Sequence, residues 1–207
     1  MPSLRDQKKA ATRQAIVDAA MARFAGRPFG DVSIDEIASA AGVARRTFFR
    51  YFPTKEDVVL DPRQLDRAFA LKALAGRREG ESDLGLAMRV LAELQRRAFG
   101  HVRPEHQLEV HRLTHREPAL AARSWLLSET ARDLIVEGLV PPSGDARARL
   151  RARVLASACV MAVDAAVTTW IEGGMREDLD TLLAEAAGHL SAGFGGARMA
   201  GELSSTS

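Results

Sequence analysis

Apolar residues recur along most of this chain at the three- and four-residue spacing of one helical face. Between positions 5 and 25, Ile16, Ala20 and Phe24 share one stripe, and charged side chains occupy other positions. The 16 Gly and 8 Pro are too few for a chain of many short strands and turns. The pattern therefore predicts an all-α fold. We expect helices over residues 5–25, 34–41, 44–51, 54 to about 74 with a break or kink at Asp61-Pro62, 83–99, 105–115, 118–138, 145–172 and 178–193.

Residues 33–52 have the pattern of two short helices joined by a tight turn. Ser33 and Glu36 form a capping-box pair, in which each side chain can bond to the backbone amide of the other. Gly42 tolerates the left-handed backbone of the turn, and Ala38 is small enough for the two helices to cross closely. This spacing predicts a helix-turn-helix. The positions expected to face inward are apolar: Ile34, Ile37, Ala41, Val43 and Phe48.

The second of these short helices is expected to show its other face to solvent. Large aromatic side chains beside arginines are costly on an exposed face without a partner. The major groove of DNA supplies such a partner, because guanidinium groups pair with guanine edges and apolar groups contact thymine methyls. The residues of this predicted face are Arg45, Arg46, Thr47, Phe49, Arg50 and Tyr51.

The stretch from Thr12 to Leu60 resembles the DNA-binding domain of the TetR family of bacterial transcription regulators. The rest of the chain matches that family in being helical and of suitable length, as expected for a divergent ligand-binding part. The resemblance implies an N-terminal three-helix helix-turn-helix domain followed by a larger helical domain. It rests on Phe24 at the end of the first helix, Phe29-Gly30-Asp31-Val32-Ser33, Ile37-Ala38, Ala41-Gly42-Val43, Thr47-Phe48-Phe49-Arg50-Tyr51-Phe52 and Lys55-Glu56.

The resemblance also implies roles for single residues. Arg45, Arg46 and Thr47 match positions that face base edges or nearby phosphates. Phe49 and Tyr51 match positions that pack on the sugar-phosphate backbone or on thymine methyls. Position 49 is often tyrosine in the family, so Phe49 keeps the apolar contact and loses a phosphate hydrogen bond.

Two further positions are implied to contact phosphate. Lys55 matches a phosphate-binding position at the start of a helix, where the helix dipole also favours an anion. Ser33, at the start of the first short helix, is expected to contact phosphate too. Phe48 and Phe52 are instead expected in the core.

Charge separates the chain into a basic head and a slightly acidic body. Residues 1–55 carry ten Lys/Arg and five Asp/Glu, a net charge of +5, which leaves −3 for the rest of a chain whose total is +2. The charge suggests a polyanionic partner for the head, although a solvated charged face would look the same. We expect a DNA-binding domain over residues 1–55, an effector-binding and dimerisation domain over 56–194, and a disordered tail over 195–207.

The predicted helices 145–172 and 178–193 are candidates for a dimer interface. The resemblance implies that they pair with their copies as a four-helix bundle, and the alternative is ordinary core within one chain. Two copies would read two half-sites one helical turn apart, or a multiple of it. The candidate residues are Ala152, Ala156, Ala158, Cys159, Ala162, Ala165 and Ala166 in the first helix and Leu179, Leu182, Leu183, Ala186, Leu190 and Phe194 in the second.

Other chemistry finds little support in the sequence. His101, His106, His111 and His115 lie close together, but no acidic or cysteine residue completes an obvious metal set. The lone Cys159 sits in an apolar run and is expected to be a buried hydrophobe. We therefore expect no cofactor, no metal and no catalytic site, and we assign no ligand-binding residues.

The absence of a secretory signal and of a long apolar run predicts a cytoplasmic protein without a membrane partner. The leading hypothesis is a repressor that binds a palindromic operator in double-stranded DNA as a homodimer and is released by a small-molecule effector. The alternatives are an activator, a regulator without an effector, or a helical enzyme with an incidental helix-turn-helix.

Overall fold

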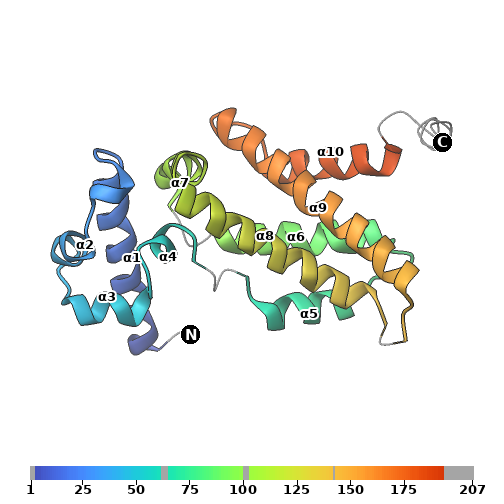
Figure 1. The fold of residues 1–207 in the computed structure, drawn as a ribbon, viewed down its shortest axis with the longest axis horizontal. Coiled ribbons are helices and arrows are strands. Elements are labelled where there is room, and N and C mark those ends of the chain that lie inside the picture. Colours follow the sequence, from blue (N-terminus) through green and yellow to red (C-terminus); the bar gives the residue numbers. More distant parts are fainter. Residues whose placement is uncertain (1–2, 62–64, 100–102, 142, 194–207) are drawn as a thin grey trace. The chain divides into compact units, whose positions relative to one another are not determined.

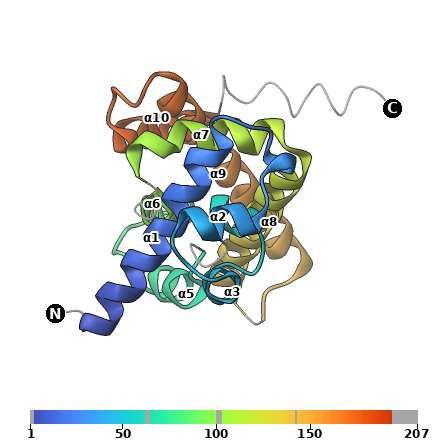
Figure 2. The same cartoon turned by 90° about the vertical axis from the view of Figure 1, so that its left-hand side faces the viewer.

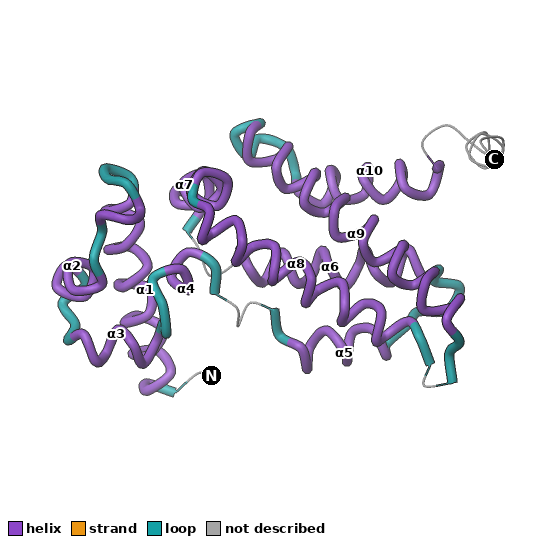
Figure 3. Tube along the Cα trace, viewed as in Figure 1, coloured by secondary structure: helices purple, strands orange, loops and turns teal. Residues whose placement is uncertain are grey.

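The computed structural model describes residues 3–61, 65–99, 103–141 and 143–193. Within these ranges every regular element is a helix and no strand is present (Figure 3). The all-α prediction is confirmed, and helix boundaries differ from the expected ones by at most a few residues outside the break after Asp61. The helices are α1 (Leu4–Phe24), the 3-10 turn η1 (Phe29–Asp31), α2 (Ile34–Ala40), α3 (Arg45–Tyr51), α4 (Glu56–Val59), α5 (Arg67–Ala75), α6 (Asp83–Phe99), α7 (Pro104–Arg116), α8 (Pro118–Leu139), α9 (Ala146–Glu172) and α10 (Leu179–Ala192) (Figure 1).

The chain forms two compact units that do not follow the sequence order. The first unit comprises residues 1–65 and 96–127, and the second comprises residues 66–95 and 128–207. Residues 96–127, which we expected in the effector-binding domain, thus group with the head. The helices α6 and α8 each contribute residues to both units. The expected tail, residues 195–207, lies outside the described residues.

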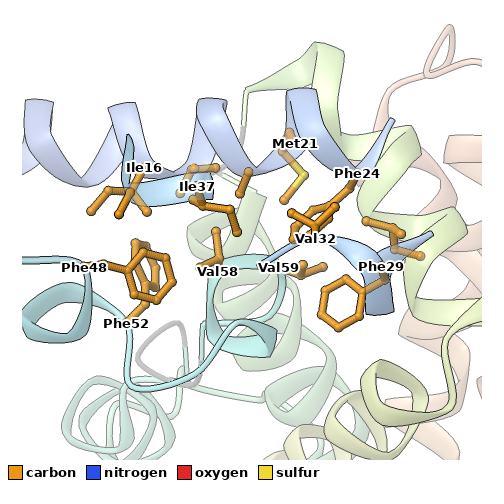
Figure 4. Packing of buried hydrophobic residues seen from close by; sticks show 14 of the residues in the cluster. Ile16, Met21, Phe24, Phe29, Val32, Ile37, Phe48, Phe52, Val58 and Val59 are labelled. Carbon is orange, nitrogen blue, oxygen red and sulfur yellow. The ribbon is translucent and has the colours of Figure 1, made fainter. Parts of the chain in front are cut away.

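The first unit is built on the buried face of α1. The side chains of Ile16, Met21 and Phe24 point from α1 toward α2, α3 and α4 (Figure 4). Leu113 of α7 and Leu120 of α8 belong to the same buried cluster. Burial of these apolar surfaces is the main force that holds the short α2, α3 and α4, which are too short to be stable alone. The other buried members of the cluster include Phe29, Val32, Ile37, Phe48, Phe52, Val58 and Val59.

The second unit contains α5, the larger part of α6, the end of α8, and the pair α9 and α10. Ala152, Ala156 and Cys159 lie on one side of α9 and are buried. Burial raises the pKa of the Cys159 thiol to about 11, so the thiol stays protonated and poorly reactive at neutral pH. A Cβ at Gly138 of α8 would lie 2.6 Å from a methyl carbon of Leu74, so α8 and α5 approach closely there.

The residues of α9 that were predicted to form a dimer interface lie on two different sides of the helix, one buried and one exposed. Its small residues Ala152, Ala156, Cys159 and Ala166 are buried within one protomer, whereas Ala165 is exposed. Placing the buried four at a dimer interface was wrong, because small residues also serve the close packing inside one chain. On α10, Leu179, Leu182 and Leu183 are likewise buried in their own protomer, and Phe194 lies outside the described residues.

One described helix, α9, has the length and mean hydropathy of a membrane-spanning segment. This is weak evidence, because the core helix of a water-soluble protein can meet the same criteria.

Candidate nucleic-acid interface

The start of α2 is fixed by the predicted capping box. The Ser33 hydroxyl accepts a hydrogen bond from the Glu36 N–H at 3.2 Å, and the Glu36 carboxylate accepts one from the Ser33 N–H at 2.8 Å. Arg27 donates to the same carboxylate at 2.5 Å. The hydrogen bond from Arg27, followed by those from Ser33, lowers the pKa of Glu36 to about 2. The cap therefore stays charged at neutral pH and holds the helix entry in place.

The turn between α2 and α3 depends on the backbone of Gly42. Its φ is +66°, in the left-handed region that glycine adopts without strain. The Val43 N–H bonds to the Ala38 carbonyl at 2.9 Å and closes the end of α2. A Cβ at Gly42 would meet nothing within 4 Å, so the need for glycine comes from φ alone. The predicted helix-turn-helix is confirmed (Figure 2).

The helix α3 has one buried and one exposed side. Phe48 and Phe52 are fully buried, as expected for core residues. Arg46 and Arg50 are exposed, and Phe49 keeps 40% of its surface accessible. The helix therefore presents a basic and partly aromatic surface while the opposite side is locked into the head.

Tyr51 does not lie on the exposed face where the sequence placed it. Only 6% of its surface is accessible, so that prediction was wrong. Tyr51 is three residues from Phe48, and residues at this spacing share one side of a helix. The Arg50 guanidinium lies 5.4 Å from the centre of the Tyr51 ring, which places the exposed cation beside the ring.

Lys55 is used inside the protein. Its ammonium group donates to the carbonyls of Phe29 and Val32 at 2.6 and 2.8 Å and lies 4.4 Å from the centre of the Phe29 ring. It thereby ties the segment between α1 and α2 to the start of α4. Two of its three N–H donors are occupied in this way, and its contact with phosphate stays a prediction.

The arginines at the start of α3 differ in their surroundings. Arg45 donates to Asp35 at 2.5 Å, and its guanidinium lies 5.4 Å from the Phe49 ring centre. Both partners of this ion pair are more than half exposed, so it is weak and can exchange for a phosphate or base contact. Arg46 has no such partner among the described residues. Thr47 is half-buried, and Ser33 is exposed.

The helix α4 is held at both ends by ion pairs that the sequence did not reveal. Asp57, which is buried, accepts a hydrogen bond from Arg123 of α8, and Asp61, also buried, accepts one from Arg13 of α1. Thr54 and Asp57 exchange reciprocal hydrogen bonds at 3.1 and 3.2 Å. This cap has a local Thr-x-x-Asp signal, whereas the Arg123 partner lies 66 residues away and leaves no local signal.

The histidines do not assemble a metal site in the described part of the chain. The rings of His111 and His115 lie 4.2 Å apart, and His115 Nδ1 lies 2.8 Å from the His111 carbonyl oxygen. His106 lies 3.3 Å from a carboxylate oxygen of Asp18 on α1. His101 is outside the described residues.

The dimensions of this surface suit a DNA groove. An α-helix with its side chains is about 10–12 Å across, and the major groove of B-DNA is about 12 Å wide, so the exposed side of α3 can enter it. Three arginines and no acidic residue lie on α3. Arginine forms bidentate hydrogen bonds with the O6 and N7 atoms of guanine, so the surface can both attract and read DNA.

Two family profiles match the chain in succession. The profile described as "Bacterial regulatory proteins, tetR family" matches residues 16–61, and the "MftR C-terminal domain" profile matches residues 87–195, more than half of the chain. The protein belongs to the TetR family. The first match covers the helix-turn-helix and α4, so this TetR-family protein has its DNA-binding motif where the sequence predicted it.

Curated relatives of this TetR-family protein are transcription regulators. It is 34% identical over 133 residues to the transcriptional regulator TcmR of Streptomyces glaucescens, an alignment that covers 62% of this chain and 58% of that relative. It is 46% identical over 52 residues to the putative mycofactocin biosynthesis transcriptional regulator MftR of Mycobacterium tuberculosis, covering 25% and 26% of the two chains. The alignments thus span less than two thirds of either relative.

A solved structure shows the same fold over most of the chain. The fatty acid degradation regulator FadR from Bacillus halodurans superposes with a TM-score of 0.50 at 22% identity and covers 90% of this chain and 96% of that one. At this identity the likeness concerns the fold.

Proposed function

We propose that this protein is a transcription regulator that binds a palindromic operator in double-stranded DNA as a homodimer and represses transcription there. The observation that carries the proposal is the exposed basic face of α3, whose opposite side is buried in the core of the head. Arg45, Arg46 and Thr47 read base edges or nearby phosphates, and Arg50 shares their side of the helix. Phe49 makes apolar contact with the DNA.

The remaining proposed DNA contacts go to the sugar-phosphate backbone. Ser33 is exposed at the start of α2 and can reach a phosphate. The buried Tyr51 contributes by holding α3 in place. Lys55 ties the start of α4 to the segment before α2, and its remaining N–H donor can contact a phosphate. The proposal gives this chain no catalytic activity and places its action in the bacterial cytoplasm.

The proposed dimer uses an exposed apolar stripe on α9. Leu150, Val154 and Met161 are 63%, 62% and 56% exposed, and their spacing of four and seven residues places them on one side of the helix. The small residues Ser157 and Ala165 lie on the same side and are also exposed, so they leave room for a close neighbour. Such a stripe is unfavourable in water and marks an interaction surface. A second copy of α9 and α10 covers it, and the dimer then presents two α3 helices to DNA.

A small-molecule effector is proposed to release the operator. The helix α8 is continuous, with residues up to Leu127 in the first unit and residues from Ser128 in the second. An effector that binds among the helices of the second unit can therefore act on the head through α8. It lowers operator affinity only if it binds better to the conformation that does not bind DNA.

The proposal is tested by selecting DNA from a random duplex library with the full-length protein. We expect enrichment of an inverted repeat whose half-sites are centred about 34–36 Å apart, or a multiple of that distance. The control is the same selection with the Arg45→Ala/Arg46→Ala variant, which should enrich no motif. A wild-type selection that enriches no sequence, or only a single unrepeated site, contradicts the proposed dimeric readout.

A further inference from the structure

A basic patch lies on the first two turns of α1, outside the surface described above. Every residue from Leu4 to Ala11 is exposed, so this segment of helix contributes nothing to the core of the head. It carries Arg5, Lys8 and Lys9. Among the described residues, Arg5 and Lys8 form no ion pair, so these side chains are available to a partner.

The one acidic residue in this segment serves the helix itself. Asp6 accepts hydrogen bonds from the hydroxyl and the N–H of Ser3 at 2.7 and 3.2 Å, and the Ser3 hydroxyl accepts from the Asp6 N–H at 3.2 Å. These bonds lower the pKa of Asp6, with the Ser3 hydroxyl as the main cause. The first turn is thus capped by the chain's own groups, and what it offers a ligand is the cationic side chains.

The patch lies on the side of α1 that faces α3. Ile16 points from α1 toward Phe48 of α3 (Figure 4). At 100° per residue, Arg5 and Lys9 project within about 20° of the direction of Ile16, and Lys8 within about 80°. At 1.5 Å per residue, Lys9 and Arg5 lie about 10 and 16 Å before Ile16 along the helix axis. In Figure 1 these turns of α1 extend past α3 toward the N-terminus.

We propose that Arg5, Lys8 and Lys9 bind the sugar-phosphate backbone beside the groove that α3 enters, as a second and sequence-independent contact with DNA. This inference rests on the proposed DNA-binding function. Charge complementarity favours DNA, because the patch carries three cations against the single acidic residue Asp6 and belongs to the same unit as the basic helix α3. Lysines on a flexible stem suit phosphate contacts, which position a protein on DNA without reading sequence.

The test replaces all three residues with glutamine, which keeps helix propensity and length. Affinity for the selected operator and for an unrelated duplex is measured by fluorescence anisotropy between 50 and 200 mM salt. Each lost phosphate contact reduces the salt slope by about 0.9, so the slope should fall by about 2.7 per protomer bound. Between 50 and 200 mM salt, the affinity of the wild-type protein should therefore fall about 40-fold further than that of the variant for each protomer bound. The difference should be the same on both duplexes.

The matched control is Arg23→Gln/Arg112→Gln/Arg116→Gln, which removes the same charge from exposed positions of the same unit away from the start of α1. It should keep the wild-type slope. The inference is overturned if the α1 variant, with an unchanged circular dichroism spectrum, keeps the wild-type slope or weakens operator binding alone. It is also overturned if the patch instead mediates binding to phosphatidylserine-containing vesicles. If the wild-type protein binds neither duplex, the proposed DNA-binding function itself is wrong, and the inference about α1 is overturned with it.

Discussion

Replacing Arg123 with methionine is expected to destabilise the head by about 3 kcal/mol. The change leaves Asp57, whose side chain is 3% exposed, charged and without its cationic partner, although the Thr54 N–H still bonds to it. Breaking a buried ion pair by removing one partner typically costs about 3–5 kcal/mol. The lower end applies here because 32% of the Arg123 side chain stays accessible to water. Hydrogen exchange of α2 and α3 amides, measured by mass spectrometry, reports this local stability directly.

Two further variants separate the ion pair from general effects. Arg67→Met removes the exposed ion pair with Glu137, whose donor and acceptor lie 2.7 Å apart, and should cost less than about 1 kcal/mol. The double variant Asp57→Leu/Arg123→Met removes both buried charges and should be less destabilised than Arg123→Met alone. If the α2 and α3 amides were equally protected from hydrogen exchange in Arg123→Met and Arg67→Met, the ion pair between Arg123 and Asp57 would not be what stabilises the head.

A charge in the exposed stripe of α9 is expected to produce monomers that bind the operator weakly. In Met161→Glu each protomer would bury a carboxylate at the proposed interface, where an unpaired charge is strongly unfavourable. Losing the second half-site reduces the apparent affinity by about 10²–10⁴-fold, because the two α3 helices no longer bind the operator together. Sedimentation velocity at micromolar concentration and anisotropy with the selected operator measure the two effects.

The control for this variant is Ala68→Glu, which adds the same charge at an exposed position of α5 in the same unit. It should stay dimeric and keep its operator affinity. A Met161→Glu protein that remains fully dimeric would mean that the interface lies elsewhere. Leu183 is unsuitable for this test because it is buried within the protomer, so a glutamate there would unfold the chain before it disturbed a dimer.

The local part of this structure could be predicted from sequence, and the reason is physical. The capping box of Ser33 and Glu36 and the turn at Gly42 depend on residues within a few positions of one another. Their geometry is therefore encoded by spacing alone. The same holds for most helix boundaries, which coincide with Gly or Pro positions such as Gly76, Pro118 and Gly173.

The features that the sequence did not predict correctly, or did not reveal, depend on tertiary packing. The rotation of α3 about its own axis is set by its packing against α2 and the buried cluster of the head, and the sequence pattern of a seven-residue helix does not decide on which side Tyr51 lies. The pair Arg123 and Asp57 joins distant segments. A small residue such as Ala156 suits close packing inside a chain and close packing between chains equally well. Its identity alone therefore does not tell whether it lies in the core or at a dimer interface.

The most direct test of the account is the affinity of the Arg45→Ala/Arg46→Ala variant for the selected operator and for an unrelated duplex, measured by fluorescence anisotropy at one fixed salt concentration. Each lost guanine contact costs about 1–3 kcal/mol, so the variant should bind both duplexes with nearly equal affinity while remaining folded. A folded variant that still prefers the operator as strongly as the wild-type protein does would show that α3 does not read the DNA.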